Sequence, residues 1–215
     1  FLPVRKGSER IPGKNTKMFA NFQGGLLELK IRQLIDSKHV DEVVVSSNDD
    51  ACIDVAEKFM KLCSKIVIDE RPNHLAQSDT NLIDLVKYAP KVCSQQHILW
   101  THVTSPFLDA EFYSKVVLKY YEVLKSGHDS LMTARKLQSF LWDKEENKVM
   151  NRNNNLKWPK TQDLRVFYEI DSGVFLAPKS VYEQMEDRIG TRPFIFETDT
   201  LQGIDVDFPE DFELA

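Results

Sequence analysis

Short apolar runs alternate along this chain with longer stretches in which apolar residues recur every three or four positions. Residues 26–36 show this helical spacing, and residues 43–45 are three consecutive valines, as in a strand buried on both faces of a parallel sheet. The expected strands are residues 1–4, 43–45, 66–68, 97–101, 130–133, 173–177 and 194–197. The expected helices are residues 26–36, 50–62, 79–88, 109–125 and 179–187, with another beginning near Pro209. This alternation predicts an α/β fold, a mostly parallel sheet with helices on both faces.

The alternation stops between residues 137 and 168, in a stretch that is too long for an ordinary connection. A floppy surface loop is one interpretation. The other is an inserted, hairpin-like arm whose apolar side chains pack against something else, such as a second subunit. Those side chains are Phe140, Leu141, Trp142, Val149, Leu156 and Trp158. We favour the arm, which divides the chain into an α/β domain (residues 1–136 and 169–215) and an arm (residues 137–168).

Composition excludes several classes of protein. The net charge of −5 argues against nucleic acid as the main partner, although it allows a local cationic cluster. Cys52, Cys63 and Cys93 have no metal-ligand spacing and suit a reducing compartment. No apolar run approaches the roughly 20 residues of a membrane span, and no leader is visible, so a cytoplasmic protein is the expectation. The chain opens inside an apolar stretch without Met, so we expect missing strand residues and leave a removed leader open.

The loop at residues 5–15 concentrates positive charge directly after the first strand. Its cationic residues and glycines are Arg5, Lys6, Gly7, Arg10, Gly13 and Lys14. Ligands of open α/β sheets bind outside the carboxyl ends of the strands, where this loop begins. Glycines let successive N–H groups converge on phosphate oxygens, and Arg and Lys side chains would neutralise a triphosphate. A basic surface loop is the alternative. The loop matches neither a Walker A motif nor a dinucleotide fingerprint.

Residues 2–15 read LPVRKGSERIPGKN. This string resembles the signature that opens the CMP-sialic acid synthetases (acylneuraminate cytidylyltransferases) and their relatives for legionaminic, pseudaminic and deoxyoctulosonic acids. The resemblance implies a Rossmann-like nucleotidyltransferase fold and CTP as a substrate, with Arg5 and Lys14 holding the leaving pyrophosphate. It assigns nucleotide binding to Arg5, Gly7, Ser8, Arg10, Lys14 and Asn15. The chain departs from the family at Glu9, where Lys is frequent.

Residues 71–80 read RPNHLAQSDT and resemble the family segment that lines the nucleotide site. The resemblance adds Arg71, Ser78 and Thr80 to the nucleotide-binding set. Arg71 could reach a phosphate or a base carbonyl. Ser78, Asp79 and Thr80 have a second interpretation as the cap of the following helix, with Asp79 or Thr80 as the capping residue.

Two segments resemble the acceptor end of the family site. Residues 102–106 read HVTSP, where the family has Gln at the first position, so the resemblance points to His102, Thr104 and Ser105. A lone His is often structural, and that alternative stays open. Residues 160–162 read KTQ and resemble an arm segment that reaches the sugar carboxylate of a neighbouring subunit. Lys160 and Gln162 are therefore candidates, although the family has Arg where Thr161 stands.

Asp205 and Asp207 lie two positions apart near the carboxyl end. In an extended segment they would share a face and could jointly hold a hard cation. A pair of acids also arises by chance, but the run from Gly203 to Ala215 resembles the closing segment of the family, whose aspartates carry Mg²⁺. We therefore predict Asp205 and Asp207 as metal ligands.

Together these motifs predict that CMP is transferred from CTP to the anomeric hydroxyl of a sialic-acid-like 2-keto sugar acid, with release of pyrophosphate. The predicted catalytic residues are Arg5, Lys14 and Asp207, Mg²⁺ is the cofactor, and the protein is a homodimer. Two rivals remain. One is a nucleotide-sugar glycosyltransferase, which usually carries its Asp-x-Asp pair in mid-chain. The other is a non-catalytic nucleotide-binding homologue, for which the departures at Glu9, His102 and Thr161 leave room.

Overall fold

The computed structural model describes residues 1–8, 10–153 and 156–215. The strands of its main sheet are β1 (Leu2–Val4), β2 (Val43–Ser47), β3 (Ile66–Glu70), β4 (His97–Trp100), β5 (Ser130–Leu137), β8 (Phe167–Pro178) and β9 (Pro193–Thr198). The helices are α1 (Gly25–Asp36), α2 (Asp50–Met60), α3 (Leu82–Val92), α4 (Ala110–Lys125), α5 (Lys179–Met185) and α6 (Pro209–Leu214). Within the described residues, no helix is long and apolar enough to cross a membrane.

The strands form one continuous sheet in the order β3-β2-β1-β4-β8-β5-β9. A parallel group β1-β2-β3 and a second group β4-β8-β5-β9 are joined because Phe1 bonds through its nitrogen to Leu99 O (2.6 Å) and through its oxygen to Thr101 N (3.2 Å). All neighbouring pairs run parallel except those made by β8, which is antiparallel to both β4 and β5. The prediction of a mostly parallel sheet is confirmed, and the sequence pattern did not reveal the reversed strand.

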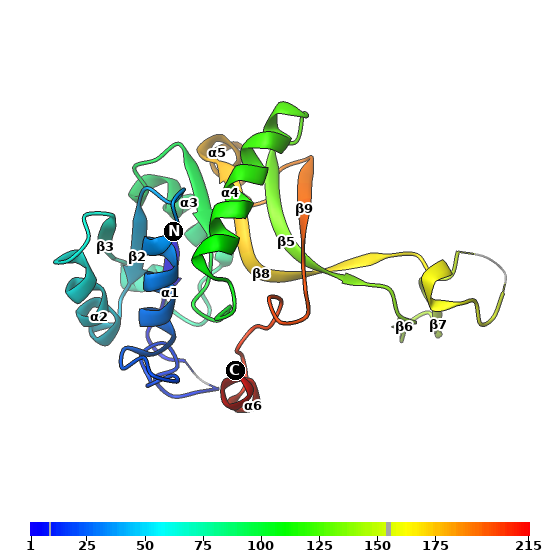
Figure 1. Ribbon diagram of the computed structural model, residues 1–215, viewed down its shortest axis with the longest axis horizontal. Helices are drawn as coiled ribbons and strands as arrows, with labels where there is room; N and C mark the ends of the chain where they lie inside the picture. The colour runs from blue at the N-terminus through cyan, green and yellow to red at the C-terminus, as the bar shows by residue number, and fades with distance from the viewer. Residues whose placement is uncertain (9, 154–155) are drawn as a thin grey trace.

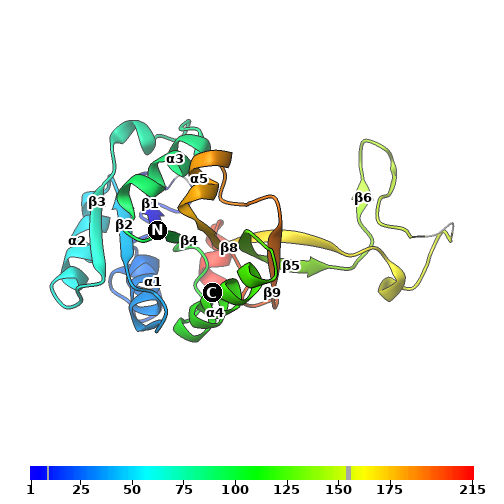
Figure 2. The same cartoon turned by 90° about the horizontal axis from the view of Figure 1, so that it is seen from above.

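Helices cover both faces of this sheet (Figures 1 and 2). Helices α1, α2 and α4 pack on one face, over a core that includes Leu26, Ile31 and Val116. Helices α3 and α5 pack together on the other face, over Trp100 and Phe175. The consecutive valines of β2 are buried towards both layers, as expected of a central parallel strand.

Helix α3 begins later than the sequence suggested. Its cap is Asn81, whose side chain accepts a hydrogen bond from Ile83 N at 3.0 Å, so neither Asp79 nor Thr80 caps it. The Thr80 hydroxyl instead donates to His74 O at 2.9 Å and accepts from Gln77 N at 3.1 Å. Thr80 thus stabilises the turn before the helix. Asn and Thr are both good caps, and the local turn decides which one is used.

Residues between β5 and β8 leave the body of the protein as an arm (Figure 1). Residues 134–137 of β5 pair with residues 167–170 of β8 to form its stem. Beyond the stem lie the short strands β6 (Trp142–Asp143) and β7 (Lys148–Val149) and a turn of 3₁₀ helix at Thr161–Asp163. Both stem strands are longer than the sequence suggested. Because the chain returns along the strand on which it left, β8 must run antiparallel to β5.

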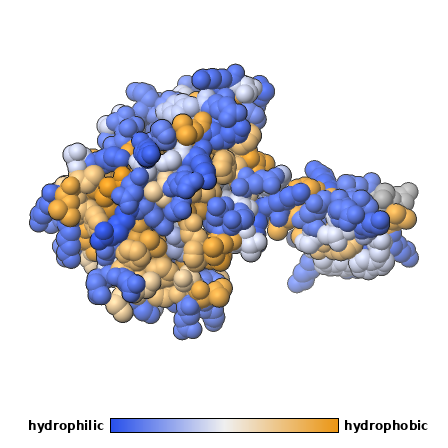
Figure 3. Space-filling model, viewed as in Figure 1, coloured by the Kyte–Doolittle hydropathy of each residue, from blue (hydrophilic) through white to orange (hydrophobic). Residues whose placement is uncertain are grey.

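The arm has internal order, which argues against the floppy loop. Asn151 is fully buried; its amide donates to Ser139 O at 2.6 Å and its carbonyl oxygen accepts from Leu141 N at 3.1 Å. The rings of Phe140 and Trp158 meet edge to face with centroids 5.2 Å apart. Figure 3 shows the arm standing clear of the body, with hydrophobic and hydrophilic side chains intermixed on its surface.

Candidate active site

A cavity of about 390 Å³ lies at the carboxyl edge of β1 and β4. The structure brings most of the predicted site residues to its wall, although they come from four separate segments of the chain. Those residues are Arg5, Ser8, Arg10, Lys14, Asn15, Arg71, His102, Thr104 and Asp207. A smaller adjoining hollow is lined by Gly7 together with residues of the same cationic loop. This edge is where open α/β sheets place their ligands.

The cationic loop and the acidic pair meet directly, although about 190 residues separate them in the sequence. Lys14 Nζ donates to Val206 O at 2.7 Å and lies 3.4 Å from Asp207 Oδ1. Arg10 Nη1 lies 3.2 Å from Asp207 Oδ2, and its guanidinium packs on the Phe208 ring. The cationic loop and Asp207 therefore flank one space.

Backbone geometry explains why this loop needs its two glycines. Gly7 has φ 81° and Gly13 has φ 64°, a left-handed conformation that side chains disfavour. Asn15 then fastens the loop, because its amide donates to Arg5 O at 3.2 Å. From the other side, Lys6 N donates to Asn48 Oδ1 at 2.9 Å. The cationic side chains are thus carried by a loop whose path is fixed by backbone contacts.

Arg71 has buried hydrogen-bond donors without acceptors. It is 5% exposed, and its Nε and Nη2 have no partner among the residues that the structure describes. Burial lowers the pKa of its guanidinium below the ordinary value. The charge of Asp69 opposes this shift, but buried N–H donors without acceptors are unfavourable, so an acceptor brought by a ligand would relieve them.

Asp205 has a buried hydrogen-bond acceptor without a donor. Its Oδ1 is buried and has no partner within the described residues, and burial raises the pKa of its carboxyl while a hydrogen bond from Thr104 opposes the rise. Asp205 and Asp207 supply hard oxygen donors that suit a divalent cation. No group of three or more acidic, His or Cys ligands occurs in the described part of the chain. A cation held here would therefore take its other ligands from substrate phosphates and water.

His102 is fixed by two hydrogen bonds. Trp100 Nε1, which can only donate, donates to His102 Nε2 at 3.0 Å, so His102 Nδ1 carries the proton and donates to Ser172 O at 2.9 Å. Burial lowers the pKa of His102 to about 4, and the charge of Arg188 contributes to this shift. The imidazole is therefore neutral near pH 7, with neither ring nitrogen free to act as a base.

A buried lysine supports the turn that carries Thr104. Lys30 on α1 is fully buried; its Nζ donates to Ser105 O and to the Tyr113 hydroxyl, both at 2.7 Å. Tyr113 in turn contacts Thr101 Oγ1 at 2.9 Å. Burial lowers the pKa of Lys30 well below its ordinary value. Thr104 O accepts from Val206 N at 2.8 Å, so the same turn also holds the acidic segment in place.

Other predicted residues lie outside the cavity. Ser78 is exposed, Thr80 belongs to the turn before α3, and Ser105 is buried with an unpaired Oγ. Lys160 and Gln162 are exposed on the arm and are not among the residues that line the cavity. Glu9 lies outside the described residues.

The cavity also contains residues that the motifs did not indicate. Trp100, Leu82 and Leu85 form an apolar wall beside the cations. Their only sequence signal was the position of Trp100 at the end of an expected strand. A nucleoside or sugar ring needs such a surface next to the polar groups that orient it.

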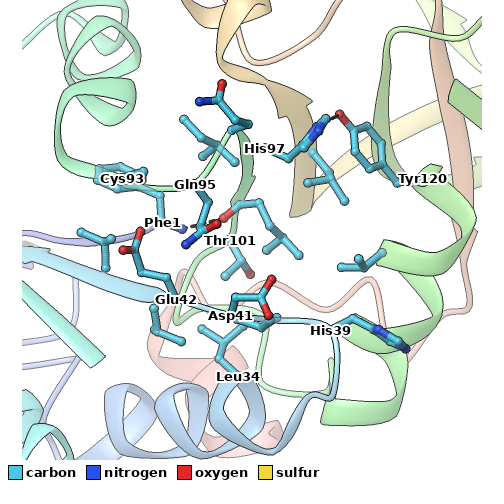
Figure 4. A pocket seen from close by; sticks show the side chains of 18 of the residues that line it. Phe1, Leu34, His39, Asp41, Glu42, Cys93, Gln95, His97, Thr101 and Tyr120 are labelled. Atoms are coloured by element: carbon cyan, nitrogen blue, oxygen red, sulfur yellow. Dashed lines mark hydrogen bonds between the residues drawn. The ribbon is translucent and has the colours of Figure 1, made fainter. Parts of the chain in front are cut away.

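A second cavity, of about 190 Å³, lies at the opposite edge of the sheet, where β2 and β4 begin (Figure 4). Its wall includes His39, Asp41, Glu42, His97 and Tyr120. Polar groups here are paired within the protein: His97 Nδ1 lies 2.8 Å from the Tyr120 hydroxyl, and Glu42 accepts from Ser94 N at 2.8 Å. None of the residues predicted for function lies in this wall.

The fold and the first cavity are those of an α/β protein in which one cationic loop and Asp207 face a shared space at the carboxyl edge of the sheet. Residues 1–206 match the family model described as cytidylyltransferase. The chain therefore belongs to the cytidylyltransferase family, and it is a nucleotidyltransferase similar to the CMP-sugar acid synthetases.

Known relatives are distant. The pseudaminic acid cytidylyltransferase of Campylobacter jejuni is 28% identical over 182 residues, covering 81% of this chain and 75% of that protein. The CMP-N,N'-diacetyllegionaminic acid synthase of Legionella pneumophila is 24% identical, covering 100% of this chain and 92% of that protein.

Solved structures share the fold. A CMP:2-keto-3-deoxy-manno-octonic acid synthetase complexed with CTP gives a TM-score of 0.65 at 13% identity, covering 99% of this chain and 94% of that one. The 4-diphosphocytidyl-2C-methyl-D-erythritol synthase of Anaerococcus prevotii gives a TM-score of 0.62 at 14% identity, covering 100% of this chain and 93% of that one.

Proposed function

We propose that this enzyme transfers CMP from CTP to the anomeric hydroxyl of a sialic-acid-like 2-keto sugar acid and releases pyrophosphate. The observation that carries the proposal is the meeting of Arg10 and Lys14 with Asp207 on one cavity wall, beside the unpaired guanidinium of Arg71. Relatives that make pseudaminic and legionaminic acid derivatives support an acidic sugar as the acceptor.

The cationic loop binds the triphosphate in this proposal. Arg5, Arg10 and Lys14 neutralise its charge, and the backbone of Gly7 and Ser8 supplies N–H groups. Asn15 holds the loop in shape through its bond to Arg5 O. Arg71 donates to a phosphate oxygen or to the cytosine carbonyl, which would satisfy its two unpaired nitrogens.

Asp205 and Asp207 would hold Mg²⁺. The buried, unpaired Oδ1 of Asp205 and the carboxylate of Asp207 fit a hard cation. When bound, Mg²⁺ neutralises phosphate charge and favours attack at the α-phosphate. Arg10 and Lys14 pair with Asp207 in the structure. CTP would draw these two cations onto its phosphates and leave Asp207 available for the metal.

In the reaction, the anomeric oxygen forms a bond to the α-phosphorus while the bond to the β-phosphate oxygen breaks. Pyrophosphate takes the released electron pair, and Arg5 and Lys14 stabilise its growing charge. The hydroxyl proton passes to solvent, because His102 offers no free nitrogen. The protein contributes positioning and charge neutralisation rather than a covalent intermediate.

Thr104 and His102 line the cavity and, in this proposal, form the end that receives the acceptor sugar. Thr104 offers a hydroxyl, and His102 positions the adjoining Trp100 and Ser172. Lys160 and Gln162 would complete this end from the arm of a partner subunit, which makes the enzyme a homodimer in this proposal. Trp142, 61% exposed on the arm, would be covered by the partner. Sedimentation as a monomer at micromolar concentration would contradict the dimer.

The test is to incubate the protein with CTP, Mg²⁺ and a panel containing N-acetylneuraminic, pseudaminic, legionaminic and 3-deoxy-manno-octulosonic acids. We expect pyrophosphate release with at least one acid and formation of the matching CMP-sugar. Transfer of a sugar from an added nucleotide sugar, with no pyrophosphate released from CTP, would favour a glycosyltransferase. Binding of CTP without turnover of any acid would favour a non-catalytic homologue.

A further inference from the structure

Arg188, in the turn after α5, lies between two aromatic rings. Its guanidinium carbon is 4.0 Å from the centroid of Phe175 and 4.8 Å from that of Trp100. The rings belong to the neighbouring strands β8 and β4, in which Phe175 and Trp100 are directly paired. This packing fixes the guanidinium over the sheet and restricts its rotation.

The guanidinium has no acceptor in the part of the chain that the structure describes. The adjacent Asp187 uses its Oδ1 to accept from the backbone N–H groups of Arg188 (2.6 Å) and Ile189 (3.2 Å). No ion pair or side-chain hydrogen bond of Arg188 occurs among the described residues. Burial lowers the pKa of the Arg188 guanidinium. A structural arginine usually donates its five N–H groups to carbonyl or carboxylate oxygens, whereas those of Arg188 have no such acceptor among the described residues.

Arg188 is not itself one of the residues that line the cavity, but it adjoins the cavity through Trp100, and its charge acts on His102 in the wall. Trp100, on which it stacks, lines that cavity and donates to His102. The phosphate-binding candidates follow β1 and β3, whereas Arg188 lies over β4 and β8, which are further along the sheet. Neighbouring strands are about 4.8 Å apart, and β4 and β8 are the first and second strands beyond β1.

We propose that Arg188 binds the carboxylate of the acceptor sugar within the same subunit. This inference rests on the proposed function and specifies how the site selects an acid. A guanidinium presents two parallel N–H donors that match a carboxylate, and the flanking rings hold it ready and keep water away. The carboxylate supplies the acceptor that the protein does not provide.

Kinetics of Arg188→Met test the assignment, because Met retains apolar packing between the rings but removes every donor. With the best acid of the panel, we expect the KM for the acid to rise by about ten- to a hundredfold while the KM for CTP changes less than about twofold. Arg188→Lys keeps the positive charge but lacks the paired N–H donors of the guanidinium, so its KM for the acid should lie between those of the wild type and Arg188→Met. Thermal unfolding confirms that each variant is folded, and Arg188→Gln replaces Arg188→Met if the latter is not.

A second measurement compares the acid with its primary amide. The wild-type enzyme should prefer the acid, and Arg188→Met should lose most of that preference. The matched control is Arg32→Met, which removes an arginine stacked on the Phe59 ring, 5.1 Å from its guanidinium and away from the cavity; it should change neither KM.

Equal rises in both KM values, or an unchanged preference for the acid, would overturn the role of Arg188 while leaving the transferase intact. Absence of pyrophosphate with every acid in the wild-type protein would overturn the proposed function, and the Arg188 assignment with it.

Discussion

The two cavities at opposite edges of the sheet differ in how their polar groups are satisfied. At the amino edge, His97 is bonded to Tyr120 and Glu42 to Ser94. At the carboxyl edge, Arg71 and Asp205 keep buried polar atoms without partners in the described chain. Native proteins pair nearly all buried polar groups, so an unpaired one in the wall of a cavity is a candidate ligand contact. Among the described residues, the cavity at the carboxyl edge has such a group in its wall, Arg71, and the cavity at the amino edge has none.

The largest effect should come from Asp207→Asn at the carboxyl edge. The amide binds a divalent cation poorly, so we expect kcat to fall by at least about a hundredfold. The fold should survive, because the ion pairs of Asp207 with Arg10 and Lys14 are partly exposed and contribute at most about 1 kcal/mol. Pyrophosphate release at saturating CTP and Mg²⁺ measures the first effect, and thermal unfolding the second. Full activity would remove Asp207 from the chemistry.

Arg71→Met should separate function from stability. Losing a charged hydrogen bond to CTP should weaken nucleotide binding by about 1.5–3 kcal/mol. The free protein, however, should become more stable by about 1 kcal/mol, because a buried guanidinium with two unpaired nitrogens is replaced by an apolar side chain. Isothermal titration with CTP and denaturant unfolding measure the two quantities. A loss of stability would mean that Arg71 has structural partners, and the contrast between the two edges would weaken.

Which elements of the fold could be predicted from the sequence depends on whether they are determined by local or by long-range interactions. Burial patterns are local, so the consecutive valines of β2 and the spacing of α1 predicted their elements correctly. The direction of β8 depends on where the arm returns, and the cap of α3 depends on a turn made by Thr80. No periodic pattern records such contacts.

The residues of the candidate site likewise fall into those that the sequence revealed and those that it did not. Its two motifs, at Lys14 and Asp207, were visible because each carries several charged residues in a short stretch, and the fold places them 3.4 Å apart. Arg188 belongs to no motif and gains its position from rings on two strands. The hydrogen bonds that make His102 a donor to Ser172 were equally invisible in the sequence.

His102→Gln tests a fully paired side chain in the wall of the carboxyl-edge cavity through the pH dependence of the free energy of unfolding. The pKa of His102 is about 4 in the folded protein against about 6.5 when unfolded, so the unfolded chain binds the extra proton and stability falls as the pH drops through this window. Between pH 7 and pH 5 this group should reduce the free energy of unfolding by about 2 kcal/mol. Gln can accept from Trp100 and donate to Ser172 without titrating, so the variant should lose this part of the acid sensitivity.

Urea unfolding at pH 7 and at pH 5 measures the difference, and His39→Gln, at an exposed position near the amino edge, is the matched control. Its pH dependence should follow the wild type. Turnover of His102→Gln near pH 7 should stay within about threefold of the wild type, since the ring has no free nitrogen for catalysis. A much larger fall in kcat would restore His102 as a participant in proton transfer.

The smallest effect is expected from Glu42→Gln at the amino edge. The amide oxygen of Gln can still accept from Ser94 N, but its NH2 group cannot accept from the Ser94 hydroxyl as the second carboxylate oxygen of Glu42 does, so unfolding should become easier by about 0.5–1 kcal/mol. The KM values for CTP and the acid, and kcat, should remain within about twofold of the wild type. A large kinetic change would show that paired polar groups can mark a site as well as unpaired ones do, and the rule drawn from the two edges would fail.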